Sequence, residues 1–271
     1  MIMEQNNKEG GKRAVPSRRG WLLAALVLAG LAIWGILEWR AHAAPGPGVA
    51  VSEEYLTRSE PFYQYDAPGV TARAGVDVSS YQGNVDWPAV KAAGADFAML
   101  RVGFRGYGTG ALVEDSTFVQ NAEGAAKAGL TVGVYFYSQA VTEAEAAEEA
   151  RFVVERLRGT DVSGPIAYDL EFYTADEART DDLTGQQATR NAIAFCDVIR
   201  QAGYEPVVYM NLHWAGSMYG MEELAELPIW LASYGPIPAL ERGVTLWQYS
   251  ESGVVDGIEG PVDLDLWFIR E

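Results

Sequence analysis

The 271-residue sequence has few of the side chains that form disulfides and metal centres. It contains one cysteine, Cys196, so no internal disulfide can form. Cys196 lies in the amphipathic stretch AIAFCDVIRQAG, which predicts a buried core side chain. The only histidines, His42 and His213, are far apart and predict no metal cluster. We therefore expect neither a metal nor a cofactor.

Basic residues are also scarce. The chain holds 20 Lys and Arg against 37 Asp and Glu, for a net charge of −17. Residues 1–40 carry a net charge of +3, so residues 41–271 carry −20. A body this acidic repels phosphate groups, which argues against nucleic-acid binding and against capture of any other polyanion.

One long apolar run is present near the N-terminus. Residues 21–37, WLLAALVLAGLAIWGIL, contain no charged residue, and tryptophans stand at both ends of the region. We predict a transmembrane signal-anchor helix over residues 21–39, inserted in the lipid bilayer and preceded by a basic cytoplasmic segment, residues 1–20. Because basic residues precede the run and few follow it, the N-terminus is expected in the cytoplasm and the bulk of a single-pass membrane protein outside.

A cleaved signal peptide is the alternative. Ala41-His42-Ala43 resembles a small-x-small cleavage site, and cleavage near Ala43 would release a secreted protein. Residues 40–73 contain Pro and Gly without a sustained period, which predicts an extracytoplasmic stalk or linker. A folded domain is expected over residues 74–271, outside the cytoplasm in both cases.

Strand and helix patterns alternate from Gly75 onward. The expected strands are 75–82, 96–104, 130–138, 165–173, 204–212, 228–235, 244–253 and 262–269. The expected helices are 86–94, 116–129, 142–158, 184–203 and 221–227. Five strand–helix pairs followed by three strands imply an α/β fold with a parallel sheet under covering helices. Eight strands in about 200 residues imply a closed but small barrel.

An open, doubly wound sheet is the alternative architecture. Such a sheet usually carries a phosphate-binding glycine loop after its first strand. The corresponding segment, SSYQGNVDW, lacks G-x-G-x-x-G, so no dinucleotide site is supported.

Two carboxylates interrupt the apolar strand PIAYDLEFY, residues 165–173. Residues i and i+2 of a strand share a face, so Asp169 and Glu171 project together at the C-terminal end, where barrels carry active sites. Their mutual repulsion predicts that one pKa rises, which leaves a protonated acid beside a charged base, as glycosidic-bond cleavage requires. An ion pair with lysine or arginine, or a metal site, is the alternative reading.

Further acids and aromatic residues lie at equivalent places. Asp77 is on the first strand, and Asp263 and Asp265 are on the last. Closure of a barrel sets these two strands side by side, so the acids would meet at one pocket mouth. Sugars stack on aromatic rings at such a rim, although ordinary core packing is the alternative for any single ring. The candidate rings are Tyr135, Tyr137, Tyr209, Trp214, Trp230, Tyr234, Trp247 and Tyr249.

Ordered segments of the chain resemble glycoside hydrolase family 25, the Chalaropsis-type lysozymes. They are GVDVSSYQGNVDW, RVGFRGYGTG, AGLTVGVYFYS, PIAYDLE, PIWLASY and WQYSESGVVDGIEGPVDLD. The resemblance covers about residues 74–271. It implies an irregular, TIM-like (β/α)5β3 barrel, in agreement with the element count.

The resemblance also implies roles for the acids. Glu171 would be the general acid of an N-acetylmuramidase, and Asp169 its partner, which stabilises positive charge or orients the substrate acetamido group. Asp77 and Asp263 would complete the acidic cluster. The implied reaction is hydrolysis of the β-1,4 bond between N-acetylmuramic acid and N-acetylglucosamine in peptidoglycan. Inversion and assistance by the substrate's own acetamido group both stay open.

Some positions depart from the family pattern. The third strand reads Tyr135-Phe136-Tyr137 where Tyr-His-Phe is common, although Tyr135 still matches a pocket tyrosine. Asp265 stands where Asn is common, and RVGFRGYG replaces a K-x-x-x-G pattern. These departures bear on the substrate-binding details, for which we name Tyr135, Tyr137, Tyr209, Trp230, Trp247 and Asp265.

The sequence as a whole therefore predicts a membrane-tethered peptidoglycan hydrolase. Its expected partners are peptidoglycan glycan strands and the lipid bilayer, and its catalytic domain is expected to be monomeric. A catalytically silent wall-binding module of the same fold is the alternative. A chitinase-like D-x-x-D-x-D-x-E barrel is disfavoured because Gly164 and Ala167 occupy positions that would need acids.

Overall fold

The computed structural model describes residues 47–172, 176–240 and 242–271. Within these ranges, an eight-strand barrel forms the centre of the folded unit. Its strands are β3 (Val70–Val78), β4 (Phe97–Arg105), β6 (Thr131–Ser138), β7 (Val162–Leu170), β8 (Pro206–Asn211), β9 (Ile229–Ala232), β10 (Leu246–Gly253) and β11 (Val262–Arg270). The closed eight-strand barrel confirms the prediction in part, because the sheet is mixed and not parallel throughout.

The strand order shows how the barrel closes. Neighbouring strands run β3-β11-β10-β9-β8-β7-β6-β4, and β3 pairs with β4 to complete the ring. Strand β11 is antiparallel to both of its neighbours, and the remaining pairs of the ring are parallel. A short strand, β5 (Leu112–Glu114), extends β4 on the outside of the ring. The C-terminal ends of the parallel strands therefore gather at one end of the barrel.

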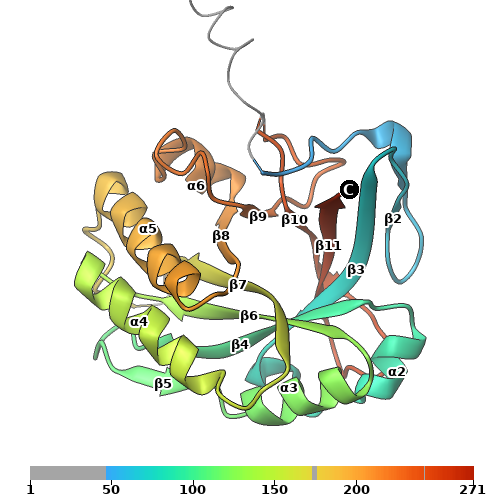
Figure 1. Cartoon of the computed structure of the whole chain (residues 1–271), viewed down its shortest axis with the longest axis horizontal. Coiled ribbons are helices and arrows are strands. Elements are labelled where there is room, and N and C mark those ends of the chain that lie inside the picture. Colours follow the sequence, from blue (N-terminus) through green and yellow to red (C-terminus); the bar gives the residue numbers. More distant parts are fainter. Residues whose placement is uncertain (1–46, 173–175, 241) are drawn as a thin grey trace, which may run out of the picture. The chain divides into compact units, whose positions relative to one another are not determined.

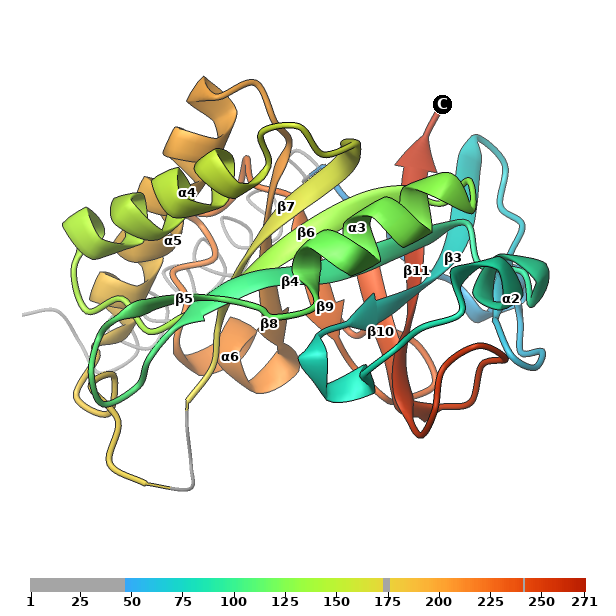
Figure 2. The ribbon, with the colours of Figure 1, turned by 90° about the horizontal axis from the view of Figure 1, so that it is seen from below.

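Helices cover the outside of the barrel (Figures 1 and 2). They are α2 (Trp87–Ala92), α3 (Phe118–Lys127), α4 (Glu143–Arg156), α5 (Gly185–Gln201) and α6 (Leu212–Ser217). Three begin at the caps expected from the sequence, since Asp86, Thr142 and Thr184 each accept a hydrogen bond from the backbone N–H three residues on. Both views show α4 and α5 side by side.

Apolar side chains pack on both faces of the strands, which explains their nearly continuous hydrophobic sequences. The larger layer lies between strands and helices and includes Cys196, buried as predicted. A smaller cluster fills the barrel interior and includes Phe97, Met99 and Trp230. Gly75 leaves room for the Phe97 ring, because a Cβ at this position would lie 2.5 Å from that ring.

The stalk expectation needs correction for residues 47–73. Val49 pairs with Val244, and Arg270 donates a hydrogen bond to the carbonyl of Gly48. Tyr65 is buried and packs edge-on against Phe268 on β11, with ring centroids 5.1 Å apart. This segment belongs to the folded unit because its aromatic side chains pack on β10 and β11, Tyr63 on Tyr249 and Tyr65 on Phe268.

The fifth helix is also placed differently from the prediction. Residues 221–227 form turns, and α6 instead begins directly after β8. Asn211 caps it by accepting a hydrogen bond from the Trp214 N–H. The sequence segment 221–227 is therefore not the fifth helix. That helix is α6, and it begins where the Asn211 side chain supplies a local cap.

The predicted membrane anchor, residues 21–39, lies outside the described residues. In the part of the chain that the structure covers, no helix combines the length and the apolar character needed to cross a bilayer.

Candidate active site

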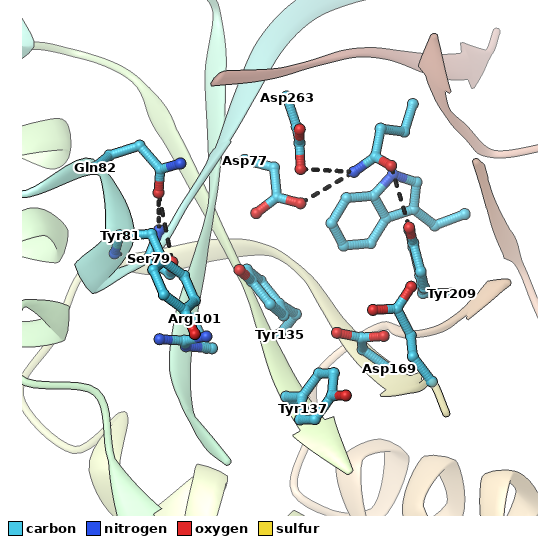
Figure 3. Close-up of a pocket in the computed structure, with 13 residues that line it drawn as sticks. Asp77, Ser79, Tyr81, Gln82, Arg101, Tyr135, Tyr137, Asp169, Tyr209 and Asp263 are labelled. Carbon is cyan, nitrogen blue, oxygen red and sulfur yellow. Dashed lines mark hydrogen bonds between the residues drawn. The ribbon is translucent and has the colours of Figure 1, made fainter. Parts of the chain in front are cut away.

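A pocket opens at the end of the barrel where the parallel strands terminate (Figure 3). Every strand of the ring contributes to it. The lining residues are Asp77, Ser79, Tyr81, Gln82, Arg101, Tyr135, Tyr137, Asp169, Glu171, Tyr209, Trp230, Gln248 and Asp263. The four acids predicted as catalytic are therefore brought together in one site.

Strand register sets the first two acids opposite each other. Asp77 on β3 and Asp263 on β11 are direct partners in the antiparallel ladder. The side-chain amide of Gln248 on β10 donates hydrogen bonds to both, over 3.1 Å to Asp77 Oδ2 and 3.4 Å to Asp263 Oδ2 (Figure 3). The amide thus supplies the donors that two adjacent carboxyls need.

Asp169 and Glu171 come from the end of β7. Asp169 lies within the strand and is 6% exposed, whereas Glu171 directly follows the last strand residue, Leu170. Asp169 Oδ1 is buried and has no hydrogen-bond partner among the described residues. The deeper carboxyl is therefore the one that water and protein donors solvate least, and this favours its neutral form.

Burial and mutual repulsion raise the pKa of all four acids. Desolvation raises the pKa of Glu171, and the charge of Asp263 adds to this, while the contact with the Tyr209 hydroxyl acts in the opposite sense. Desolvation, then Glu171 and Asp77, raise the pKa of Asp169 well above its usual value. Desolvation and Glu251 raise the pKa of Asp263 to about 6. All four pKa values are thus shifted toward the protonated form, which is the direction that the sequence predicted for one acid of the pair.

Tyrosine hydroxyls complete the polar network. Tyr135 donates a hydrogen bond to Asp77, whose pKa burial and the neighbouring Asp263 raise strongly. Tyr209 and Tyr234 lie 3.1 and 2.9 Å from Gln248 Oε1, which accepts from them. These contacts fix the orientation of the Gln248 amide, so that its nitrogen faces the acids.

The chemistry of the pocket is that of proton transfer. Within the described ranges, no group of three or more His, Cys, Asp or Glu side chains is arranged to hold a metal ion. What converges instead is a set of carboxyls with raised pKa and a rim of aromatic rings, which suits acid catalysis on a sugar.

Comparison with known proteins identifies the family. Residues 76–258 match the sequence profile of glycosyl hydrolases family 25. The chain belongs to this family. The prediction made from its motifs is thereby confirmed.

Family 25 relatives include two lysozymes. The autolytic lysozyme of Clostridium acetobutylicum is 29% identical over 192 residues, which are 70% of this chain and 54% of that protein. Lysozyme M1 of Streptomyces globisporus is 29% identical over an alignment of 281 positions, gaps included, that covers 89% of this chain and 88% of that protein. The chain thus spans about half the length of the first relative and most of the second.

Solved structures of bacterial cell-wall enzymes share the fold. The modular autolysin LytC of Streptococcus pneumoniae, in complex with a synthetic peptidoglycan ligand, aligns with a TM-score of 0.65 and 22% identity, over 78% of this chain and 52% of that chain. The lysozyme of Streptomyces coelicolor aligns with a TM-score of 0.58 and 24% identity, over 72% and 91%.

The structure adds a cation to this family 25 pocket that the sequence reading did not single out. Arg101 on β4 donates from Nε to Asp115 Oδ2 over 2.8 Å and from Nη2 to Ser80 Oγ over 3.0 Å. Its guanidinium lies 5.2 Å from the centre of the Tyr81 ring. Its charge also lowers the pKa of Asp77 and Asp169, against the larger effect of burial. The position of Arg101 as a lone arginine in the apolar strand 96–104 was the sequence signal that could have identified it as a pocket residue.

Two residues predicted to bind substrate do not line the pocket. Trp247 is fully buried on the outer side of β10, where its N–H donates to the Ser233 carbonyl over 2.7 Å. Its neighbour Gln248 points inward, so alternation along the strand turns Trp247 outward. The other expected rings, Tyr135, Tyr137, Tyr209 and Trp230, do line the pocket.

Asp265 lies below the pocket floor. It is fully buried, and its Oδ1 accepts a hydrogen bond from the Trp230 ring N–H over 2.8 Å. Burial and Asp77 raise its pKa well above the usual value. It shares a strand face with Asp263 but lies two residues deeper in the barrel, so it supports Trp230 instead of facing the pocket.

Proposed function

We propose that this family 25 chain is a muramidase that hydrolyses the β-1,4 bond between N-acetylmuramic acid and N-acetylglucosamine in peptidoglycan. The observation that carries the proposal is the convergence of four carboxyls with raised pKa in one pocket lined by aromatic rings. Two lysozymes among its relatives and a structural neighbour solved with a synthetic peptidoglycan ligand support the substrate class.

Glu171 is the proposed general acid. Its carboxyl lies at the pocket and has a raised pKa, which favours the protonated form that donates to the glycosidic oxygen. Donation of this proton accompanies cleavage of the bond to C1 of the muramic acid residue, and the departing sugar leaves with a neutral hydroxyl. Of the four acids, Glu171 is the one that follows its strand, which gives its longer side chain the most reach.

Asp169 is the proposed partner. Positive charge develops at the sugar C1 as the bond breaks, and an opposite charge nearby favours the ionised form of a carboxyl. Asp169 then stabilises that charge or orients the substrate acetamido group. Attack of water on C1, with loss of its proton to a carboxylate of the cluster, completes the hydrolysis. If the acetamido oxygen attacks C1 first, water then opens the cyclic intermediate in the same way. Asp77 and Asp263 complete the acidic cluster, and both accept hydrogen bonds from the Gln248 amide.

We also propose that residues 21–39 tether the enzyme to the membrane, with the catalytic domain outside the cytoplasm. The support is the uncharged apolar run and the basic residues before it. Membrane fractions of cells that express the full chain are expected to retain it after alkaline carbonate extraction. A mature chain beginning at Ala44 in the medium would contradict the tether and indicate cleavage.

Glu171→Gln tests the catalytic proposal. Purified peptidoglycan is incubated with the protein, and the products are analysed by mass spectrometry for the sugar at each new reducing end. The wild-type protein is expected to produce muramic acid reducing ends, and Glu171→Gln to lose at least about 10²-fold in rate, since general acid catalysis supplies that much or more. Glu259→Gln, at an exposed acid outside the pocket, is the matched control and should retain full activity.

Other outcomes contradict the proposal. N-acetylglucosamine at the new reducing ends would overturn the bond specificity. Undiminished activity of Glu171→Gln would remove Glu171 as the acid. Binding of muropeptides by the wild-type protein without any product would instead support a catalytically silent module.

A further inference from the structure

Gln139 stands where the β6–β7 ladder ends. The last register pair of these two parallel strands is Ser138 with Leu170, so Gln139 and Glu171 are the next residues on each strand. The Gln139 side chain is fully buried. Its Nε2 donates a hydrogen bond to the main-chain carbonyl of Glu171 over 2.8 Å. A side chain thus continues the ladder by one step and holds the backbone from which Glu171 projects.

The Gln139 amide is itself oriented by its surroundings. Its Oε1 accepts a hydrogen bond from the Thr180 hydroxyl over 2.9 Å, and Thr180 is also fully buried. Because a hydroxyl can donate to the amide oxygen, Nε2 is directed to Glu171. One amide therefore ties together both ends of the chain segment between Glu171 and Thr180.

A buried ion pair fixes the backbone at Gln139. Glu149 on α4 accepts from the Gln139 N–H over 3.4 Å and from Ser138 Oγ over 2.6 Å. Arg105 at the end of β4 donates to the same carboxylate over 2.7 Å. These contacts anchor Gln139 to a helix and two strands, so its amide has little freedom to move away from Glu171.

Glu171 depends on this support more than its neighbours do. It lies beyond the last residue of β7, so the sheet ladder does not hold its carbonyl. Its carboxyl position is set mainly by the backbone, because the proton of the neighbouring Tyr209 hydroxyl is donated to Gln248 Oε1. A shift of about 1 Å in a catalytic group is enough to cost about 10²-fold in rate.

We propose that Gln139 is a positioning residue for the reaction, which places the Glu171 carboxyl at the glycosidic oxygen through the Glu171 main chain. The proposal rests on the proposed function. Gln139 does not line the pocket, so it acts on the rate and not on substrate binding.

The test measures kcat and KM on soluble peptidoglycan fragments across pH 4–8 for the full-length protein and three variants. Gln139→Leu removes the donor and is expected to lower kcat about 10- to 100-fold with KM within twofold of the wild-type value. Thr180→Val keeps the Gln139 amide but removes the hydroxyl that orients it, so we expect a smaller loss of kcat than in Gln139→Leu. Thr189→Val removes a buried hydroxyl of α5 that bonds Gly185 and Gly220, away from the pocket. This control should lower the melting temperature without lowering kcat.

Gln139→Glu tests the positioning role through the pH dependence of kcat, which a purely structural role of Gln139 would leave unchanged. A buried carboxyl favours its protonated form, which can still donate to the Glu171 carbonyl. Its kcat should therefore exceed that of Gln139→Leu at low pH and fall more steeply than the wild-type kcat as pH rises and the donor is lost. Hydrogen exchange gives a readout that is independent of activity: the peptide that contains Glu171 and Phe172 should exchange faster in Gln139→Leu than in Thr189→Val.

The proposal is overturned if Gln139→Leu folds and keeps the wild-type kcat, or if exchange at Glu171 is unchanged. If Gln139→Leu fails to fold, wild-type kcat and pH dependence in both Gln139→Glu and Thr180→Val overturn it. Failure of the wild-type protein to cleave peptidoglycan would count against the proposed function instead, and the hydrogen-exchange comparison would still decide the role of Gln139.

Discussion

Asp77 and Asp263 face each other across the β3–β11 pair, and one amide, that of Gln248, donates to both carboxyls. This pair exists because the barrel closes: its two acids are separated by most of the folded domain in the sequence and meet only through the antiparallel last strand. The pairing of β11 with β3 therefore both closes the barrel and brings the acids of the cluster together.

Replacing Gln248 tests how strongly charge repulsion among the acids of the pocket affects activity and stability. Gln248→Glu removes the donor to Asp77 and Asp263 and adds a fifth carboxyl. The added charge disturbs the protonation of the four acids, so the variant should lose at least about tenfold in activity. At pH 8 the five carboxyls ionise and repel one another, so the unfolding free energy of the variant should be about 1–3 kcal/mol lower than that of the wild type. Urea denaturation at pH 5 and pH 8 measures this difference.

Gln248→Met is the matched control for that substitution. It removes the same hydrogen bonds without adding a charge, so its loss of stability should vary less with pH than that of Gln248→Glu. Equal pH dependence in the two variants would show that the carboxyls do not interact as their arrangement implies.

The raised pKa of Asp263 makes a signed prediction about stability. Its pKa is about 6 in the folded protein against a usual value of 3.8, so between these values the folded state binds more protons than the unfolded state. The stability contribution of this group therefore falls as pH rises from about 4 through about 6 and is constant above.

The measurement compares wild type with Asp263→Asn. Urea denaturation at half-unit steps between pH 4 and 7 gives the free energy of unfolding of each protein. The difference between wild type and variant should decrease as pH rises in this window, because the asparagine does not titrate. Taking the difference removes the contributions of carboxyls whose pKa is lowered, such as Asp115 and Glu145. An increase with pH would contradict the assigned direction.

Gly75→Ala should disturb the inside of the barrel. The added Cβ would lie 2.5 Å from the Phe97 ring and 2.6 Å from the Phe97 carbonyl, so side chain and backbone both have to shift. We expect a loss of about 1–3 kcal/mol in unfolding free energy, the usual cost of overpacking. Gly216→Ala is the control, since nothing lies within 4 Å of its added Cβ and the residue is helical. That change should stabilise by up to about 1 kcal/mol. Thermal denaturation of both variants decides the matter, and equal effects would contradict the packing argument.

The sequence predicted most of the barrel because local signals agreed with the tertiary structure. The predicted strand 96–104 differs from β4 by one residue at each end, and 130–138 differs from β6 by one residue at its start. Both were readable because apolar runs bounded by turn residues mark strands buried on both faces. Helix starts were equally readable from their caps. The first strand was predicted five residues too late, because Val70 to Ala74 gains its pairing from β11, a contact that no local pattern records.

Within the site, the acids were predictable and their supports were not. Asp77, Asp169, Glu171 and Asp263 stand out as charges in apolar strands. Trp247 shows the limit of that reasoning: an aromatic residue fits either face of a strand, so only the inward direction of its neighbour reveals that it packs outside. Gln139 carries no such signal, because a glutamine after a strand is ordinary until its partner on another strand is known.

The packing of residues 47–73 on the barrel has a practical consequence for how this enzyme is produced and compared. The family match starts at residue 76, yet Phe62 and Tyr65 are as buried as core residues, and Tyr63 stacks on Tyr249 at 4.2 Å. A recombinant protein that begins at residue 76 would expose the apolar surface of β10 and β11 that residues 47–73 cover. An exposed apolar surface of this kind promotes aggregation. Expression should therefore start upstream of Gly48, so that this wrapping stays in place.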